Sequence, residues 1–159
     1  MSLSAPSIQA FRGAGWRFGI AAARFNEALV DRLLERVTAT LRAAGVKAAD
    51  MAVLRVPGSH EVPWAAQALA QGRAGRCDAV IGLGVLIAGD TNHHEMVGES
   101  VSQALQRVAL DSRIPVINGV IVVNSLAEAK ARCGGRIDRG AEFAAAALEM
   151  AALKRKFSR

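Results

Sequence analysis

Hydrophobic residues along this chain alternate between short continuous runs and longer stretches with helical spacing. The most continuous run, residues 79–87 (AVIGLGVLI), is followed by a polar loop and then by apolar residues three or four positions apart. A continuous apolar run of this length is typical of a strand buried on both faces, as in the middle of a parallel sheet. The spaced apolar residues that follow favour an amphipathic helix. We expect the rest of the chain to be organised around this strand–loop–helix unit.

The same unit is repeated along the sequence. Strands are predicted over residues 16–22, 51–56, 79–87 and 114–123. Helices are predicted over about residues 27–44, 62–71, 93–112 and 126–132, and a long alanine-rich helix ends near residue 156. This alternation predicts an α/β fold, a three-layer sandwich with a central four-stranded parallel, flavodoxin-like sheet flanked by helices on both faces. Residues 1–15 have no such period, so we expect a flexible N-terminal segment there and a single domain over residues 16–159.

Residues at the ends of the predicted helices agree with this division. Asn26 is a plausible N-cap for the first helix, and Gly45 stands where glycine usually ends one. Pro63 fits the first turn of the second helix, where a missing N–H does no harm. Ser125 followed by Glu128 is a capping-box pattern at the start of the helix over residues 126–132.

Composition and charge narrow the class of protein. Hydrophobic residues make up 52% of the chain and aromatic residues only 4%, with no tyrosine, which favours a compact globular fold and leaves few rings to stack on bases. The net charge of +6 is scattered except at Lys154, Arg155 and Lys156, which are typical of cations at a helix end. A basic nucleic-acid-binding protein would show steeply salt-dependent binding. Without a basic stripe that carries aromatic residues, we expect no nucleic-acid partner.

Cysteine usage and the longest apolar runs indicate the compartment. Cys77 and Cys133 are 56 positions apart, which matches no metal-binding or redox spacing, so we expect two reduced thiols. The first fifteen residues lack the basic start and apolar core of a signal peptide. The longest apolar run is too short to span a bilayer. We therefore predict a soluble cytoplasmic protein that does not contact a membrane.

The polar residues of interest follow the predicted strands. In a parallel sheet all strands end at the same edge, so residues 24–27, 57–61, 89–93 and the region after residue 123 are expected to converge there. Helix starts and imidazoles at such an edge suit an anion or a nucleotide-like heterocycle. The residues alone leave simpler interpretations open, with Phe25 in the core and Asn26 and Glu61 as helix caps. His93 and His94 point about 100° apart on a helix, and His60 adds no recognised metal spacing, so no metal site is predicted.

Motifs spread along the chain resemble those of the 6,7-dimethyl-8-ribityllumazine synthase family. They are FNE at residues 25–27, VPGSHEVP at 56–63, GVLIAGDTNH at 84–93, PVINGV at 115–120, and RGAE at 139–142 with EMA at 149–151. The resemblance covers about residues 16–157. It implies condensation of 5-amino-6-(D-ribitylamino)uracil with 3,4-dihydroxy-2-butanone 4-phosphate, with release of phosphate and water and without a cofactor. This is the penultimate step of riboflavin biosynthesis.

The resemblance also implies roles for individual residues. His93 matches the family's proton-transfer histidine, and Phe25 matches the ring that stacks on the pyrimidine. Arg132 matches the phosphate-binding arginine, whose guanidinium suits a phosphate. The backbone at Asp90 and Thr91 would meet the same phosphate at a helix start. The further substrate-binding residues implied are Asn26, Ser59, His60, Glu61, Val85, Leu86, Ile87 and Asn118.

The sequence departs from the family's pattern at several positions. The family often has arginine at Ala88 and aromatic residues at His60, His94 and Asn118, and Asn118 corresponds to a position that faces the uracil from a neighbouring subunit. An alternative function is therefore a catalytically weak lumazine- or flavin-binding paralogue that serves as a carrier or sensor. The resemblance implies a homo-oligomer built from pentamers and leaves open a pentamer, a decamer or a sixty-subunit shell. The loop after Arg132 is about one residue shorter than in many relatives, which favours a non-shell form.

Overall fold

The central element is a parallel sheet of four strands. The computed structural model describes residues 9–72 and 76–158. The flexible N-terminal segment was predicted over residues 1–15, and its first eight residues lie outside this part of the chain. The sheet has the order β2-β1-β3-β4, and all three strand pairs are parallel. Its strands are β1 (Phe18–Ala23), β2 (Met51–Val56), β3 (Ala79–Ile87) and β4 (Val116–Val123). The predicted four-stranded parallel sheet is confirmed.

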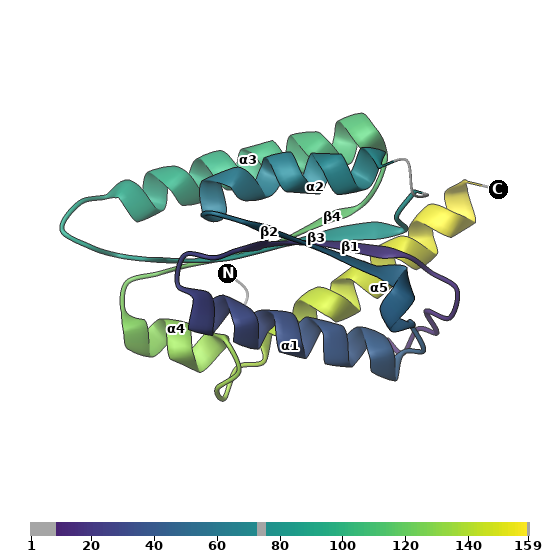
Figure 1. Cartoon of the computed structure of the whole chain (residues 1–159), viewed down its shortest axis with the longest axis horizontal. Helices are drawn as coiled ribbons and strands as arrows, with labels where there is room; N and C mark the ends of the chain where they lie inside the picture. Colours follow the sequence, from purple (N-terminus) through teal and green to yellow (C-terminus); the bar gives the residue numbers. More distant parts are fainter. Residues whose placement is uncertain (1–8, 73–75, 159) are drawn as a thin grey trace.

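Helices cover both faces of this sheet, as Figure 1 shows. On one face lie α2 (Val62–Gln71) and α3 (His93–Ser112), and on the other lie α1 (Glu27–Ala43), α4 (Leu126–Arg132) and α5 (Arg139–Phe157). Two single turns of 3-10 helix, η1 (Ala48–Asp50) and η2 (Ser59–Glu61), lie on either side of β2 in the sequence. The predicted three-layer α/β sandwich is therefore confirmed.

The core consists of two apolar layers, one on each face of the sheet. Side chains alternate along the strands, so that Ile20 and Ile81 pack with the layer of α1 and α5, whereas Ala21 and Val80 pack with the layer of α2 and α3. Burying one isoleucine or valine side chain stabilises the fold by about 1.5–3 kcal/mol. Because β1 and β3 lie in the middle of the sheet, both of their faces are buried, which accounts for their continuous apolar sequence.

The first strand is shorter at its start than predicted. It begins at Phe18 rather than at residue 16, because the backbone N–H of Arg17 donates to the carboxylate of Asp78 at 2.8 Å instead of joining the sheet. The ring of Trp16 lies 5.4 Å from the guanidinium of Arg155. Arg155 in turn donates to both oxygens of Asp78, at 2.8 and 2.9 Å. Polar contacts from the last turns of α5 therefore replace the predicted start of the strand.

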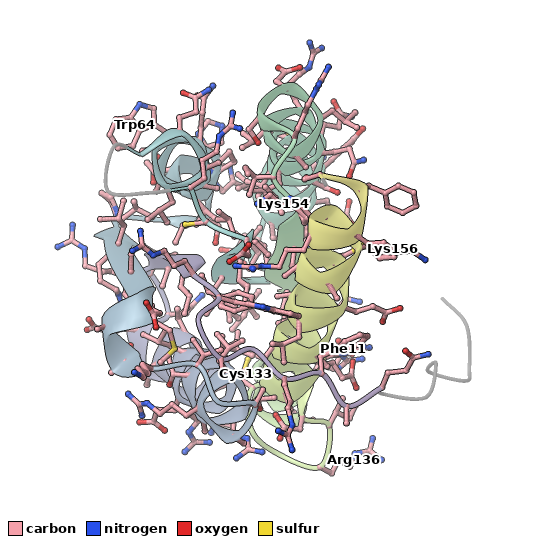
Figure 2. All side chains as sticks on the ribbon, turned by 90° about the vertical axis from the view of Figure 1, so that its right-hand side faces the viewer. Phe11, Trp64, Cys133, Arg136, Lys154 and Lys156 are labelled. Atoms are coloured by element: carbon pink, nitrogen blue, oxygen red, sulfur yellow. The ribbon has the colours of Figure 1, made fainter. Side chains whose placement is uncertain are left out.

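Lys154 joins the same cluster. Its Nζ donates to the backbone carbonyl of Cys77 at 3.2 Å and lies 3.6 Å from the carboxylate of Asp78. In Figure 2, Lys156 points away from the body of the protein. Burial opposes ionisation of Asp78, but hydrogen bonds from Arg155 and from the N–H of Arg17, with the charges of Arg155 and Lys154, lower its pKa. This cluster ties the final helix to the starts of β1 and β3.

The predicted helix ends are mostly confirmed. Gly45 follows α1 with φ +93°, the left-handed conformation in which glycine ends a helix. Ser125 accepts a hydrogen bond from the N–H of Glu128, as predicted for the capping box of α4. Asn26 stands at the N-cap position of α1, as predicted. Its side chain makes no capping hydrogen bond, although the residue precedes α1 directly.

Candidate functional site

The turn after β1 is fixed by contacts to two other strands. Asn26 has left-handed backbone angles, φ +58° and ψ +42°, and its side-chain Nδ2 donates to the carbonyl of Val85 at the end of β3, at 2.8 Å. The N–H of Phe25 donates to the carbonyl of Pro57, which follows β2, at 3.0 Å. The Phe25 ring is 73% exposed and so is not a core residue. The turn therefore presents an aromatic ring at the carboxyl edge of the sheet.

The segment after β2 places a carboxylate and an imidazole side by side. Glu61 Oε2 accepts a hydrogen bond from the N–H of Gly58 at 2.8 Å, which leaves Oε1 as the oxygen nearest His60 Nδ1, at 3.9 Å. Ser59 is buried, and its hydroxyl packs so closely on Gly84 of β3 that a Cβ there would lie 2.3 Å from Ser59 Oγ. Glycine at position 84 therefore lets η2 lie directly on the sheet.

His60 and Glu61 meet the start of α3 at one cavity. The cavity has a volume of about 550 Å³, and its lining includes His60 and Glu61 from η2 and His93 from the first turn of α3. The rest of the lining comes from α3: Met96, Val97 and Ser100. The sequence prediction missed these three residues. Their spacing from His93 places them on the same face of the helix, so this spacing was the signal that could have found them.

The loop between β3 and α3 carries the residues assigned to phosphate. Val85 is buried, Leu86 and Ile87 are half-buried, and Asp90 and Thr91 are exposed. Thr91 Oγ1 lies 3.4 Å from the backbone nitrogen of His93 and accepts its hydrogen bond. The remaining N–H groups of the first turn of a 20-residue helix point out of its N-terminus, where an anion is stabilised.

Of the predicted site residues, His60, Glu61 and His93 line this cavity, and Asn118 and Arg132 are among those that do not. Asn118 is exposed on β4, and its Oδ1 accepts a hydrogen bond from the N–H of Val120 at 3.0 Å. Arg132, at the end of α4, donates from Nη1 to the carbonyl of Glu128 at 3.2 Å. Neither residue lines the cavity that contains His93. One copy of the chain therefore does not bring all the predicted residues together.

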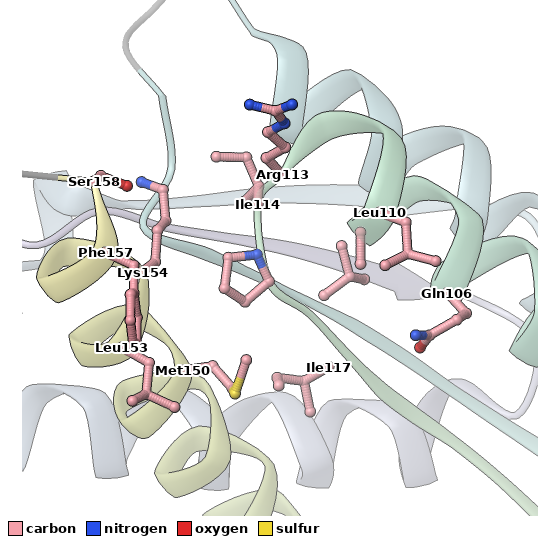
Figure 3. A pocket seen from close by; sticks show the side chains of 13 residues that line it. Gln106, Leu110, Arg113, Ile114, Ile117, Met150, Leu153, Lys154, Phe157 and Ser158 are labelled. Atoms are coloured by element: carbon pink, nitrogen blue, oxygen red, sulfur yellow. The ribbon is translucent and has the colours of Figure 1, made fainter.

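A second cavity of about 550 Å³ lies near the amino end of β4, between α3 and α5 (Figure 3). Apolar side chains line much of it, including Leu110 from α3, Ile117 from β4, and Met150, Leu153 and Phe157 from α5. Leu110 and Phe157 are 68% and 81% exposed. The sequence analysis assigned no function to this groove, which contains none of the predicted site residues.

The described residues were also compared with the requirements of a metal site, a reactive thiol and a membrane span. Across residues 9–72 and 76–158, no three His, Cys, Asp or Glu side chains gather in a way that could hold a metal ion. Cys77 and Cys133 are buried free thiols, and burial raises the pKa of Cys133 to about 11. Within the same ranges, none of the helices combines the length and the apolar composition that a membrane span requires.

The fold and this site define a class of protein, a parallel α/β protein that binds small molecules where its strands end. The family model described as 6,7-dimethyl-8-ribityllumazine synthase matches residues 15–155. This chain is 43% identical over 141 residues to the 6,7-dimethyl-8-ribityllumazine synthase of Halorhodospira halophila, covering 88% of this chain and 89% of that protein. It is 44% identical over 140 residues to the enzyme of the same name from Aquifex aeolicus, covering 87% and 90%. The chain belongs to the 6,7-dimethyl-8-ribityllumazine synthase family.

Proposed function

We propose that this protein is an enzyme that condenses 5-amino-6-(D-ribitylamino)uracil with 3,4-dihydroxy-2-butanone 4-phosphate to form 6,7-dimethyl-8-ribityllumazine. The observation that carries the proposal is the cavity at the carboxyl edge of the sheet, whose lining includes both His93 and Glu61, in a chain of this family. The reaction moves protons at nitrogen, oxygen and carbon while phosphate and water leave. A histidine at the cavity suits these steps because imidazole can both accept and donate protons near neutral pH.

The roles of the individual residues form part of the proposal. His93 transfers protons, and the exposed ring of Phe25 stacks on the pyrimidine. The N–H groups at the start of α3 bind the phosphate beside Asp90 and Thr91. Ser59, His60 and Glu61 form the wall of the pyrimidine pocket, with the backbone of residues 85–87. Much of the acceleration then comes from holding two substrates together, which alone can lower a barrier by about 7–11 kcal/mol.

We further propose that the site is completed between subunits of a pentamer. Arg132 and Asn118 come from α4 and β4, which contribute no residue to the cavity of their own chain, and this supports a role for them in the site of a neighbouring copy. Large apolar side chains at the surface supply contacts for such packing, among them Trp64 at 71%, Met96 at 61% and Phe157 at 81% exposed. The mass in solution by light scattering is expected to be five times 16.7 kDa or a multiple of that mass. A monomer would contradict the shared site.

We place this activity in the cytoplasm, which the buried free thiols of Cys77 and Cys133 support because reduced cysteines are typical of that compartment.

The test of the function is direct. Purified protein is mixed with both substrates, and the fluorescent lumazine product is followed. Wild type is expected to turn over, and His93→Ala is expected to lower turnover while leaving the KM of the phosphate substrate largely unchanged. Tight flavin binding without product formation would instead support a carrier or sensor, and unchanged turnover in His93→Ala would remove His93 from its role.

A further inference from the structure

We propose that His60 is a second proton-transfer residue in the cavity that it shares with His93. This inference rests on the proposed condensation reaction and extends it, because position 60 is otherwise assigned only to the wall of the substrate pocket. Both imidazoles line the same cavity, one from η2 and one from α3. They are carried by different elements of the fold.

The carboxylate of Glu61 lies near the imidazole of His60. Gly58 N–H fixes one oxygen of this carboxylate at 2.8 Å, and the other oxygen lies 3.9 Å from His60 Nδ1. At this distance the carboxylate attracts a protonated imidazole without forming a hydrogen bond to it. The His60 side chain is 67% exposed, so a substitution there removes no core contact.

The lining of the cavity limits the groups that can share this role. Glu61 is the titratable neighbour from η2 itself, and His93 is the titratable residue that α3 contributes. The other lining residues from α3, which are Met96, Val97 and Ser100, carry no charge, and no lining residue comes from β1, β3 or α2. Proton transfer in the described cavity therefore falls to two imidazoles and one carboxylate.

The chemistry of condensation uses a proton acceptor and a proton donor at the same time. When the amine nitrogen bonds to the carbonyl carbon, the carbon–oxygen π electrons move to the oxygen. That oxygen gains two protons and leaves as water, while the nitrogen gives up its two protons and forms the imine. With two imidazoles in the cavity, one accepts protons from nitrogen while the other donates protons to oxygen.

The experiment compares pH–rate profiles of the oligomeric enzyme with both substrates. The variants are His60→Gln, which keeps a polar side chain, and His60→Phe, which restores the aromatic residue common in the family. His94→Gln is the matched control, because it removes the third histidine, which does not line the cavity. Circular dichroism and light scattering check that each variant keeps the fold and the assembly.

We expect kcat at pH 7 to fall about 100-fold in both His60 variants, the lower end of what a positioned general acid or base contributes. We also expect one ionisation step to disappear from their kcat profiles, whereas His94→Gln keeps every step. Profiles of both His60 variants that superimpose on wild type would overturn the proposal, and so would full activity in His60→Phe with a loss only in His60→Gln, which indicates ring contact. Absence of product with the wild type would refute the proposed function itself and is thus distinct from failure of the His60 role.

Discussion

The hydrogen bond from Asn26 to Val85 gives the sharpest test of how the site is positioned. Because it joins the turn after β1 to the end of β3, it holds the backbone that carries Phe25 at the carboxyl edge of the sheet. Three variants of Asn26 separate the contribution of the hydrogen bond from that of the left-handed backbone. Asn26→Gly keeps the left-handed backbone at no steric cost but loses the hydrogen bond. Asn26→Ala loses the bond and strains the backbone, and Asn26→Asp tolerates the conformation but sets a carboxylate oxygen against the Val85 carbonyl.

The magnitudes follow from these contacts. Losing the Asn26–Val85 bond is expected to lower the free energy of unfolding by about 1 kcal/mol, and by up to about 3 kcal/mol if the carbonyl stays unpaired. In Asn26→Ala, holding alanine in the left-handed conformation costs a further 1–2 kcal/mol or so. In Asn26→Gly, the more flexible unfolded chain costs about 0.5–1 kcal/mol in entropy, which offsets part of the difference between the two variants. Asn26→Ala should therefore be about 1 kcal/mol less stable than Asn26→Gly, and Asn26→Asp should fall below Asn26→Gly as well.

The assay pairs urea unfolding with steady-state kinetics. All three variants are expected to raise the KM for the pyrimidine substrate, because Phe25 loses its fixed position, and Asn26→Gly should do so with the least loss of stability. Wild-type stability and KM in Asn26→Gly would refute the positioning role of the hydrogen bond. Equal stability of Asn26→Ala and Asn26→Gly would refute the argument from backbone strain.

Three further predictions test other parts of the structure. Asp78→Asn should lower the free energy of unfolding by about 2 kcal/mol at pH 7, because the charged partners of Asp78 lose its carboxylate. Since the pKa of Asp78 is lowered in the fold, the difference in unfolding free energy between variant and wild type should shrink below about pH 4 in urea melts. A difference that stays constant with pH would contradict the charge argument. Buried Cys133, with its pKa raised to about 11, should resist iodoacetamide at pH 8 until the protein is unfolded, as mass spectrometry would show, whereas rapid labelling of native protein contradicts its burial. Gly140→Ala should lower the melting temperature, because the added Cβ would lie 2.5 Å from Arg36 Cβ and 2.9 Å from the Leu33 carbonyl oxygen, both in α1. An unchanged melting temperature would contradict this close packing of α5 on α1.

The hydrophobic pattern predicted elements well where burial alone determines them. The helix predicted over residues 62–71 and the strand predicted over residues 79–87 match α2 and β3 residue for residue. A central strand buried on both faces carries a continuous apolar run, and a helix on a sheet carries an apolar stripe, so both patterns are local in the sequence. The order of the strands in the sheet depends on long-range pairing and was not predicted.

Local patterns failed where the partner of a polar group is distant in sequence. Arg17 gives its N–H to Asp78, 61 positions away, so the first strand begins later than its apolar residues suggest. Asn26 has the residue type of an N-cap, yet its amide donates to Val85, 59 positions away. Neither contact leaves a signal in the neighbouring residues.

The candidate site was predictable to a similar extent. Topology alone places the ends of parallel strands at one edge, and this rule predicted that the segments of His60, Glu61 and His93 would converge. The structure brings these three residues to one cavity. Arg132 and Asn118 entered through the family resemblance only, and neither lines that cavity in a single chain.

The most direct measurement of the central claim is lumazine formation by the double variant His60→Gln, His93→Gln beside each single variant. If the cavity between η2 and α3 is where protons move, the double variant should turn over more slowly than either single variant, with the KM of the phosphate substrate close to that of wild type. Wild-type turnover in the double variant would contradict the assignment of the chemistry to this cavity.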